Sequence, residues 1–347
     1  MSKPTLNDVA DAAGVSRATA SRALSGYGRI SPETVSLVKR AAERIGYQPN
    51  EIARSMRAGK TRTIGLVIIA DFTNVFFDRA TKGIVDTARA LGYQVLIYNT
   101  NEDVALEREA ITTLTQKQVD GLIVVPSTAE GHEHLIALTK SRTPLVIIDR
   151  LLPGVKATTI TTDDATSCEA AVDEAVAAGH KNLAFLIATP TIQGFQSKMP
   201  QLQNSAIESR VNGFQAGAKK HKKIHTEWLF SEESPEVAVD AARKLLDSAE
   251  KPSIIFTSNN DMVLAVLKVV GERGLTIGKD ISLVTVDDSA WLEALTPGIS
   301  VIQRPVDDLA ELAVRKLVGL MEKTSTRVDA TLLPTQLISR GSIAKLN

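Results

Sequence analysis

The sequence has very little cysteine, few aromatic residues and no long hydrophobic run. Cys168 is the only cysteine among 347 residues, which excludes an intramolecular disulfide framework and any cysteine-based zinc site within one chain. No stretch approaches the roughly 18 consecutive apolar residues of a membrane span. The N-terminal segment MSKPTLNDVA also lacks the apolar centre of a secretory signal. We therefore expect a cytoplasmic protein that makes no contact with a membrane.

Charge is distributed unevenly along the chain, although the net charge is zero. The first 62 residues contain 11 Lys and Arg against 5 Asp and Glu, which gives them a net charge of +6 and leaves −6 for the remainder. A small basic module therefore precedes a larger acidic body. This asymmetry points toward nucleic acid, while charge segregation on solvated faces is the alternative explanation. Hydrophobic residues make up 44% of the chain, and its length favours two or three domains.

The basic module predicts two short helices joined by a tight turn. The first helix should end near Ala12. Gly14 can then adopt a positive φ angle, and Ser16 can cap a second helix over residues 17–24. Such a pair forms a helix-turn-helix, whose second helix enters the major groove of DNA. A third helix, from Pro32 to Ile45, would complete the core.

The exposed side of the second helix carries the candidate base-reading residues. Arginine can donate paired hydrogen bonds to guanine O6 and N7, and alanine offers a methyl contact to thymine. We expect Arg17, Ala18 and Arg22 to read bases. Hydroxyl and amide side chains suit phosphate contacts, and the candidates are Thr5, Ser16, Thr19, Ser21 and Asn50. An ordinary helical hairpin with solvated arginines is the alternative.

Two segments, TLNDVADAAGVSRATASRALSG and IGYQPNEIARSMRAGKT, resemble the lactose-repressor (LacI/GalR) family. The resemblance implies a hinge helix that forms on the operator, enters the minor groove and levers the central base step apart. Ala53 and Met56 match its groove-facing positions, with Arg54 beside them, and Met56 replaces the family's usual leucine. An isolated helix of about eight residues is unstable in water, so it would need DNA and a partner to form.

From Ile64 the chain alternates short apolar runs of β character with amphipathic helices, and after residues 158–163 this rhythm restarts. The pattern predicts two doubly wound parallel sheets. The expected fold class is an all-α helix-turn-helix domain with a hinge helix, followed by a two-lobed α/β domain like the periplasmic binding proteins, as the family resemblance implies. The predicted domains are 1–47 for the helix-turn-helix, 48–61 for the hinge and linker, 62–160 plus 292–323 for the first lobe, and 161–291 plus 324–340 for the second.

Polar residues that directly follow the strands are candidate effector ligands, because open α/β sheets bind ligands beyond the carboxyl ends of their strands. Carboxylates, amides and arginines around aromatic faces suit a hydroxyl-rich ligand such as a free sugar, a cyclitol or a nucleoside. The residues are Asp71, Asn74, Phe76, Phe77, Arg150, Arg210, Asn260, Asp287 and Trp291. The family's R-x-x-G-F pattern implies Arg210. Trp291 could close over the ligand or be a core or interface aromatic, and loop caps or surface ion pairs are the alternative for the polar residues.

Three further features of the sequence bear on the cavity or on metal binding. Arg304 stands where the family often has glutamine. Residues 189–207 form a long loop that could reshape the mouth of the cleft or contact a partner, but an unstructured insertion is the simpler account. His132 and His134 lack the helical spacing and companions of a metal site, so we expect them to be solvated.

The sequence contains no phosphate-binding loop, nucleophile elbow or paired zinc motif. We therefore expect no catalytic residues, no metal and no cofactor, and thus not an enzyme. A Rossmann-like enzyme would need a glycine-rich first β-α turn, which residues 70–76 lack. A secreted solute-binding protein would share the fold but would need a signal peptide. Neither alternative explains the basic module.

The expected function is therefore that of a sequence-specific transcriptional regulator, most simply a repressor of carbohydrate or polyol metabolism genes. A homodimer would place two recognition helices on a palindromic operator. No leucine heptads follow Ile338, which favours a dimer over a tetramer. A small hydroxyl-rich effector would release the DNA, and co-repression by the effector is the alternative.

Overall fold

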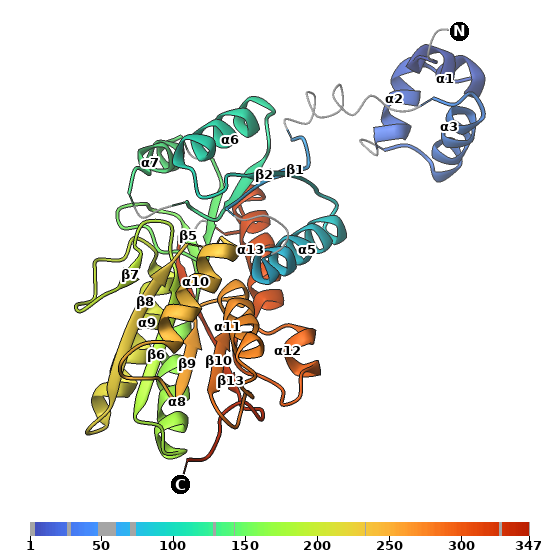
Figure 1. The fold of residues 1–347 in the computed structure, drawn as a ribbon. Coiled ribbons are helices and arrows are strands. Elements are labelled where there is room, and N and C mark those ends of the chain that lie inside the picture. The colour runs from blue at the N-terminus through green and yellow to red at the C-terminus, as the bar shows by residue number, and fades with distance from the viewer. Residues whose placement is uncertain are drawn as a thin grey trace. The chain divides into compact units, whose positions relative to one another are not determined.

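The computed structural model describes residues 4–25, 29–47, 60–69, 74–127, 130–141, 143–232, 234–325 and 328–346. The chain divides into two compact units, Met1–Thr63 and Ile64–Asn347 (Figure 1). Across the described ranges, no helix is both long enough and apolar enough to cross a membrane.

The described residues of the first unit form three helices: α1 (Leu6–Ala13), α2 (Arg17–Ser25) and α3 (Pro32–Arg44). Thr5 and Asp8 form a capping box at the start of α1. Gly14 ends this helix with φ of 63°, a left-handed conformation that glycine adopts without strain. The predicted helix-turn-helix is therefore confirmed, with helix ends within one residue of the prediction.

Small side chains allow these three helices to pack closely. The core consists of Val9, Ala10, Ala13, Ala20, Ala23, Val38, Ala41 and Ala42. Ala20 is fully buried between the helices. The guanidinium of Arg44 donates to the carbonyl oxygen of Ala12 at 3.0 Å, which ties the end of α3 to the turn of the motif.

The first lobe of the second unit contains a six-stranded sheet in the order β12-β5-β4-β3-β1-β2. Its strands are β1 (Thr63–Ile68), β2 (Gln94–Asn99), β3 (Gly121–Val124), β4 (Leu145–Ile148), β5 (Thr158–Asp163) and β12 (Ala330–Pro334). Helices α5 (Val75–Ala90) and α13 (Val306–Met321) cover one face. Helices α6 (Val104–Gln116) and α7 (Glu133–Lys140) cover the other.

The second lobe contains a seven-stranded sheet in the order β13-β11-β10-β9-β6-β8-β7. Its strands are β6 (Asn182–Ala188), β7 (Gly194–Phe195), β8 (His225–Ser231), β9 (Ile254–Thr257), β10 (Ser282–Val286), β11 (Ser300–Gln303) and β13 (Gln336–Ile338). The two edge strands, β13 and β7, pair antiparallel with their neighbours, and the ladders between β11 and β8 are parallel.

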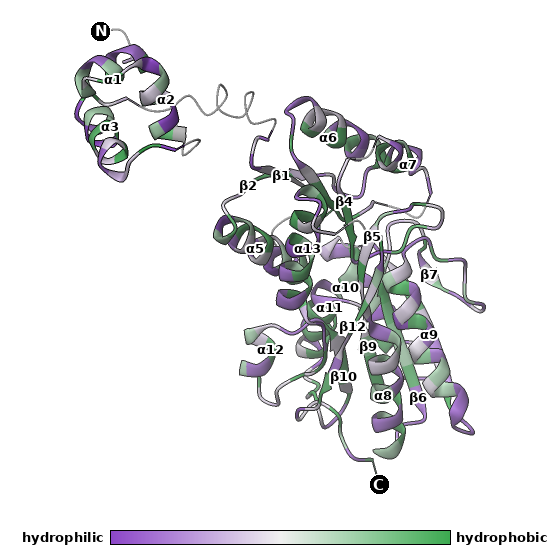
Figure 2. Cartoon of the chain, turned by 180° about the vertical axis from the view of Figure 1, so that it is seen from behind, coloured by the Kyte–Doolittle hydropathy of each residue, from purple (hydrophilic) through white to green (hydrophobic). Residues whose placement is uncertain are grey.

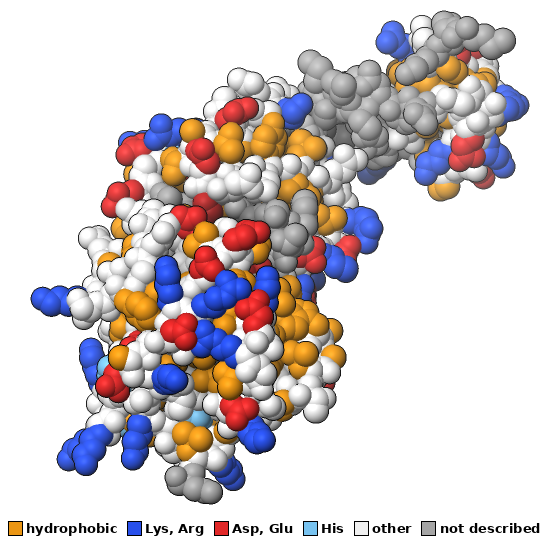
Figure 3. All heavy atoms as spheres, viewed as in Figure 1, with side chains coloured by type: hydrophobic (Ala, Val, Ile, Leu, Met, Phe, Trp, Pro, Cys, Tyr) orange, Lys and Arg blue, Asp and Glu red, His pale blue; other side chains and the backbone are white. Residues whose placement is uncertain are grey.

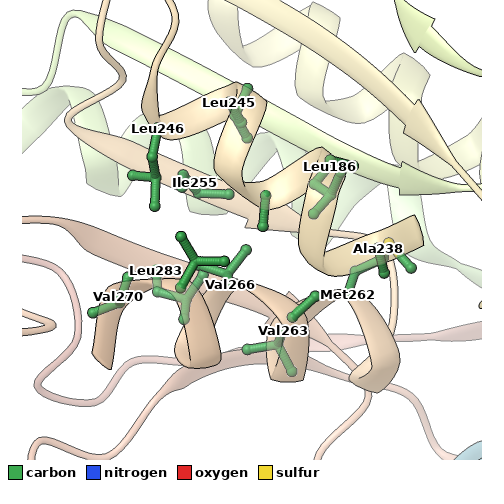
Figure 4. Packing of buried hydrophobic residues seen from close by; sticks show 14 of the residues in the cluster. Leu186, Ala238, Leu245, Leu246, Ile255, Met262, Val263, Val266, Val270 and Leu283 are labelled. Atoms are coloured by element: carbon green, nitrogen blue, oxygen red, sulfur yellow. The ribbon is translucent and has the colours of Figure 1, made fainter. Parts of the chain in front are cut away.

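Helices cover both faces of this second sheet as well. Helices α8 (Asp164–Ala177) and α9 (Ser205–Lys220) pack on one face. Helices α10 (Pro235–Leu246) and α11 (Asn260–Glu272) pack on the other, where Figure 4 shows Leu245 of α10 and Val266 of α11 in one cluster with Ile255 and Leu283 of the sheet. Figure 2 shows the central strands of this sheet largely in hydrophobic colours, whereas the helices around it carry mixed colours. The predicted two-lobed α/β fold class is thus confirmed.

The chain crosses between the lobes three times, from β5 to α8, from β11 to α13 and from β12 to β13. The predicted lobe boundaries are therefore wrong near the C-terminus. Strand β11, within the predicted first-lobe range 292–323, pairs with β10 of the second lobe. Strand β12, predicted in the second lobe, pairs with β5 of the first. A short apolar strand carries no local signal for the sheet that it joins, because only long-range pairing decides it.

Other elements differ from the predictions. Strand β8 and the short helix α12 (Ala290–Ala294) are not among the predicted elements. The stretch 189–207 is not an unstructured insertion, because its strand β7 pairs antiparallel with β8.

Candidate functional site

The second helix of the first unit exposes the residues predicted to read bases. Arg17, Ala18 and Arg22 are exposed, whereas Ala20 and Ala23 are buried in the core. The Nε of Arg22 donates to the carbonyl oxygen of Ala18 at 3.3 Å, so the side chain lies along the outer face of α2. This helix therefore presents two arginines and a methyl group to the surroundings.

Three of the residues predicted to contact phosphate, Thr5, Ser16 and Thr19, lie at helix N-termini, whereas Ser21 lies within α2. Thr5 donates to Asp8 Oδ2 from its backbone nitrogen at 2.7 Å and from its hydroxyl at 2.9 Å. Ser16 Oγ accepts from the backbone nitrogen of Thr19 at 3.1 Å. Helix N-termini attract phosphate through their backbone N–H groups as well as their side chains. The predicted residues Asn50, Ala53, Arg54 and Met56 lie outside the described residues.

A cavity of about 560 Å³ lies between the two lobes, within the volume range of small-molecule sites. Its lining comes from segments that follow strands of both sheets, as the rule for open α/β sheets predicts. The first lobe and the crossing segment contribute Ile69, Asn74, Phe77, Asn101, Glu102, Ser127, Asp149, Arg150 and Arg304. The second lobe contributes Ala188 to Thr191, Leu202 to Asn204, Ala206, Ile207, Arg210, Glu232, Ser234, Pro235, Asn259, Asp261 and Asp287.

Arg304 joins the two lobes at this cavity. Its Nε and Nη2 donate to the two carboxylate oxygens of Asp287, each at 2.7 Å, and its Nη1 donates to Asp149 Oδ1 at 2.8 Å. The three side chains are between 4% and 7% exposed. The guanidinium carbon also lies 3.5 Å from the centre of the Phe76 ring. The end of β4 in one sheet is therefore tied to the end of β10 in the other.

Burial alone would lower the pKa of Arg304. The charge and hydrogen bonds of Asp287, with the charges of Asp164 and Asp149, more than offset this and raise the pKa above its usual range. Asp149 and Asp287 have φ angles of 71° and 70°, which turn each carboxylate toward the arginine immediately after its strand. Arg304 thus stays charged and acts as the common counter-ion of both carboxylates.

Arg150 is held on the first-lobe side of the cavity. Its Nη1 donates to the carbonyl oxygens of Pro126 and Ser127 at 2.9 and 2.6 Å, and its Nη2 forms an ion pair with Glu102. Its Nε lies 3.8 Å from Asp149 Oδ2. A chain of ion pairs therefore connects the first lobe to the second. It links Glu102, Arg150, Asp149, Arg304 and Asp287 in that order.

A buried carboxylate stabilises the first-lobe side of the cavity near Ser127. Glu107 accepts from the backbone nitrogen of Ser127 at 2.6 Å and lies 2.6 Å from Nε2 of His134. The side chain of His134 is only 13% exposed, so the prediction of a solvated imidazole is wrong. Sequence spacing alone could not reveal this contact, because α6 and α7 meet only in the folded lobe.

Arg210 is the corresponding arginine of the second lobe. Its Nε donates to Asp164 Oδ2 at 2.8 Å and its Nη1 to the carbonyl oxygen of Ser258 at 2.8 Å. Asp164 also accepts from the Thr162 hydroxyl at 2.7 Å and is almost fully buried. Arg210 therefore reaches the cavity as part of a neutral pair.

The structure brings five of the predicted effector residues to the cavity: Asn74, Phe77, Arg150, Arg210 and Asp287. It does not bring Phe76, Asn260 or Trp291 there. Phe76 lies beneath Arg304, and Asn260 points to Asp287 and Ser289 while its neighbour Asn259 lines the cavity. Trp291 packs on the second-lobe core from α12, so it does not close over a ligand. Asp71 lies outside the described residues.

Several lining residues were not predicted. Asn101 and Glu102 follow β2 by the same rule that identified the other candidates, so the sequence contained this signal. Arg304 follows β11 in the same way. Glu232 follows β8, which the sequence pattern did not reveal.

Residues 189–204, hereafter the 189–204 segment, form one wall of the cavity. Six of its residues line the space: Thr189, Pro190, Thr191, Leu202, Gln203 and Asn204. Gln193 donates to Glu232, another lining residue, and the Thr189 nitrogen donates to the carbonyl oxygen of Ser231 at 2.8 Å. The wall is therefore hydrogen-bonded to the end of β8.

Comparison with known proteins identifies the family. The model of the bacterial regulatory proteins of the lacI family matches residues 5–50, and that of the periplasmic binding protein-like domain matches residues 172–343. The chain is 30% identical over 339 residues to the HTH-type transcriptional regulator PtxS of Pseudomonas putida, which covers 97% of this chain and 95% of that protein. The chain belongs to the LacI family.

Other similarities of this LacI-family chain extend over its whole length. It is 29% identical over 343 residues to catabolite control protein A of Priestia megaterium, covering 97% of this chain and 98% of that one. The solved structure of the lac repressor dimer bound to operator and the anti-inducer ONPF shares its fold, with a TM-score of 0.83, 22% identity, and coverage of 99% and 100%. The chain is thus a DNA-binding transcriptional regulator, and its family is one of regulators rather than enzymes.

Proposed function

We propose that this LacI-family regulator is a repressor of carbohydrate or polyol metabolism genes, released from a palindromic operator by a small hydroxyl-rich effector. The observation that carries the proposal is the cavity between the lobes, where carboxylates, arginines and amides surround a space of about 560 Å³. Each hydroxyl of a polyol can donate to a carboxylate and accept from an arginine or amide. A ribose-like sugar, a cyclitol such as inositol, or a nucleoside fits this chemistry.

The three chain crossings suggest how binding reaches the DNA. An effector that contacts Arg150 of the first lobe and Arg210 of the second favours one angle between the lobes. The first lobe begins with β1, directly after the segment that leads to the helix-turn-helix. A coupling free energy of about 1.4 kcal/mol is enough for a tenfold change in operator affinity, and operator binding must weaken effector binding by the same factor.

A homodimer would complete this mechanism by placing two copies of α2 on two half-sites. Exposed apolar side chains support a self-association surface on the second unit. Leu96 and Ile97 lie on the edge strand β2, and Leu264 on α11 is 50% exposed. Hydrophobic side chains also gather beside α12 on the face seen in Figure 3.

The test is a thermal-shift screen of the full chain against sugars, cyclitols, nucleosides and their phosphates, followed by titration of an operator fragment with each hit. A compound that stabilises the protein and releases the operator supports the proposal. A compound that tightens operator binding would make the protein a co-repressor-dependent regulator. Absence of any stabilising compound would contradict a hydroxyl-rich effector.

The assignment of the base-reading residues predicts a separation of activities. Arg22→Ala should weaken operator binding by about tenfold or more and relax the base preference at one position, because a paired arginine–guanine contact is lost. The thermal shift produced by an effector should stay unchanged. Fluorescence anisotropy on operator variants measures the first effect. Arg315→Ala, on the outer face of α13, is the control, and equal weakening by both variants would contradict a base-reading role for Arg22.

A further inference from the structure

The charged side chains around the cavity are unequal in number. Among its described lining residues, three are arginines: Arg150, Arg210 and Arg304. Five are acidic: Glu102, Asp149, Glu232, Asp261 and Asp287. The described lining therefore has two more acidic than basic side chains, although the three arginines alone would suggest a positively charged site.

Each arginine is already paired with a carboxylate of the protein itself. Arg304 binds Asp287 through two hydrogen bonds and Asp149 through a third. Arg150 pairs with Glu102. Arg210 pairs with Asp164, a buried carboxylate behind the cavity wall that adds one more negative charge. No arginine of the described lining therefore presents an uncompensated positive charge to a ligand.

This arrangement discriminates between classes of polyhydroxyl ligand. A carboxylate or phosphate group on the effector would enter a partly buried space with excess negative charge, where like-charge repulsion is poorly screened. A hydroxyl group meets no such repulsion, because it donates to a carboxylate oxygen and accepts from a remaining guanidinium N–H group. An ammonium group would be attracted.

We propose that the cavity selects an effector without a carboxylate or phosphate group, and that Glu102 is a specificity-determining residue because it neutralises Arg150. The inference rests on the proposed function, since it concerns the effector of that same site. The cavity should therefore bind neutral sugars and amino sugars more tightly than sugar acids and sugar phosphates of the same size.

Glu102 is the counter-charge within reach of the effector. Its side chain is 27% exposed, whereas that of its partner Arg150 is 5% exposed. The carboxylates of Asp164 and Asp287 are buried to 1% and 7% exposure, so they form part of the scaffold. Replacing Glu102 with glutamine keeps the size and an oxygen acceptor but removes the charge. The carboxylate of an acidic ligand could then take its place beside Arg150.

The experiment measures calorimetric affinity of the full chain for matched probe sets: ribose, ribonate and ribose phosphate; glucose, glucosamine, gluconate and glucose phosphate; inositol and inositol phosphate. Within each set we expect the acid and the phosphate to bind at least about tenfold more weakly than the neutral or amino member. Glu102→Gln should reduce this difference by about tenfold. Glu109→Gln, which removes an exposed carboxylate of α6, should leave it unchanged.

The outcomes separate this inference from the proposed function. Preferred binding of an acid or phosphate by the unaltered chain would overturn the inference and leave a hydroxyl-rich effector standing. An unchanged difference in Glu102→Gln would overturn the role of Glu102. Failure of every probe to bind would count against the effector class itself and against the inference with it.

Discussion

At the level of single residues, the guanidinium of Arg304 connects the ends of two strands from different sheets. Asp149 follows β4 and Asp287 follows β10, and Arg304 follows β11 at the point where the chain crosses to α13. Removing one partner from such a buried network leaves uncompensated charge in a low-dielectric interior. The same residue therefore contributes to lobe geometry and to the electrostatics of the cavity.

Substituting Arg304 tests that contribution. Arg304→Gln should lower the free energy of unfolding of the second unit by about 3 to 5 kcal/mol, because two buried carboxylates lose their shared counter-ion. Urea denaturation followed by circular dichroism measures the change. The control is Arg315→Gln on α13, whose ion pair with Glu311 is more than half exposed and should contribute less than about 1 kcal/mol. Similar losses in both variants would show that Arg304 is not a buried connection.

A second prediction concerns pH. His180 is buried, and its ring nitrogens lie 2.8 Å from the Ser253 hydroxyl and 3.1 Å from the carbonyl oxygen of Ala344. Burial lowers the pKa of His180, and the hydrogen bond to Ala344 opposes this only in part. The unfolded chain, with a His pKa near about 6.5, therefore takes up a proton that the folded chain resists. Stability from this group is complete above that pH and is lost as the pH falls below it.

His180→Gln separates this effect from general acid destabilisation. The variant should be less stable than the unaltered chain at neutral pH, but its free energy of unfolding should fall less steeply below a pH of about 6.5. Urea unfolding at a series of pH values measures both slopes. Parallel slopes would mean that His180 does not contribute to the pH dependence.

Much of the cavity could be read from sequence because strand ends are recognisable as apolar runs followed by polar residues. Asn74, Arg150 and Asp287 were found in this way. Asn260 was misassigned by one position, since the direction of a side chain at a helix start depends on the backbone and not on spacing. The sequence alone shows Arg304 only as a departure from the family pattern, because its partners Asp287 and Asp149 lie 17 and 155 residues away in the chain.

At the level of elements, the 189–204 segment gives the cavity a wall that the strand pattern alone did not predict. Strand β8 has the sequence HTEWLFS, and only its last three residues are buried, so it lacks a continuous apolar run. Because β8 cannot be recognised from the sequence, β7 has no predicted partner. No secondary structure is therefore predicted for the segment before α9. Pairing between two weak signals is a long-range event, which local patterns cannot show.

Shortening this segment should separate binding from folding. Replacing residues 191–202 with a short Gly-Ser linker should keep cooperative unfolding, because β7 is a two-residue edge strand. The thermal shift caused by an effector should fall strongly, since Thr191 and Leu202 line the cavity. Phe195→Ala, at a side chain that is 47% exposed, is the control and should preserve the shift. An undiminished shift in the shortened chain would remove the segment from the site.

At the level of the whole molecule, helix α2 and the cavity between the lobes belong to two compact units, and the boundary between these units in the sequence falls between Thr63 and Ile64. The first unit has its own small core, and the two lobes of the second have theirs. A fragment that begins at Ile64 should therefore fold alone and bind the effector with the affinity of the full chain. Calorimetry on the fragment checks this. An unfolded fragment, or one with much weaker effector binding, would show that the first unit is needed for the cavity.

The three crossings between the lobes also constrain how such a regulator can be rebuilt by recombination. Neither lobe is one continuous stretch, because α13 and β12 return to the first lobe and β13 then returns to the second. Exchanging one lobe with that of a relative would need a junction at each crossing, whereas exchanging the first unit needs a single junction near Thr63. Operator preference can thus be passed between genes in one piece, while effector preference has to change residue by residue within a shared cavity.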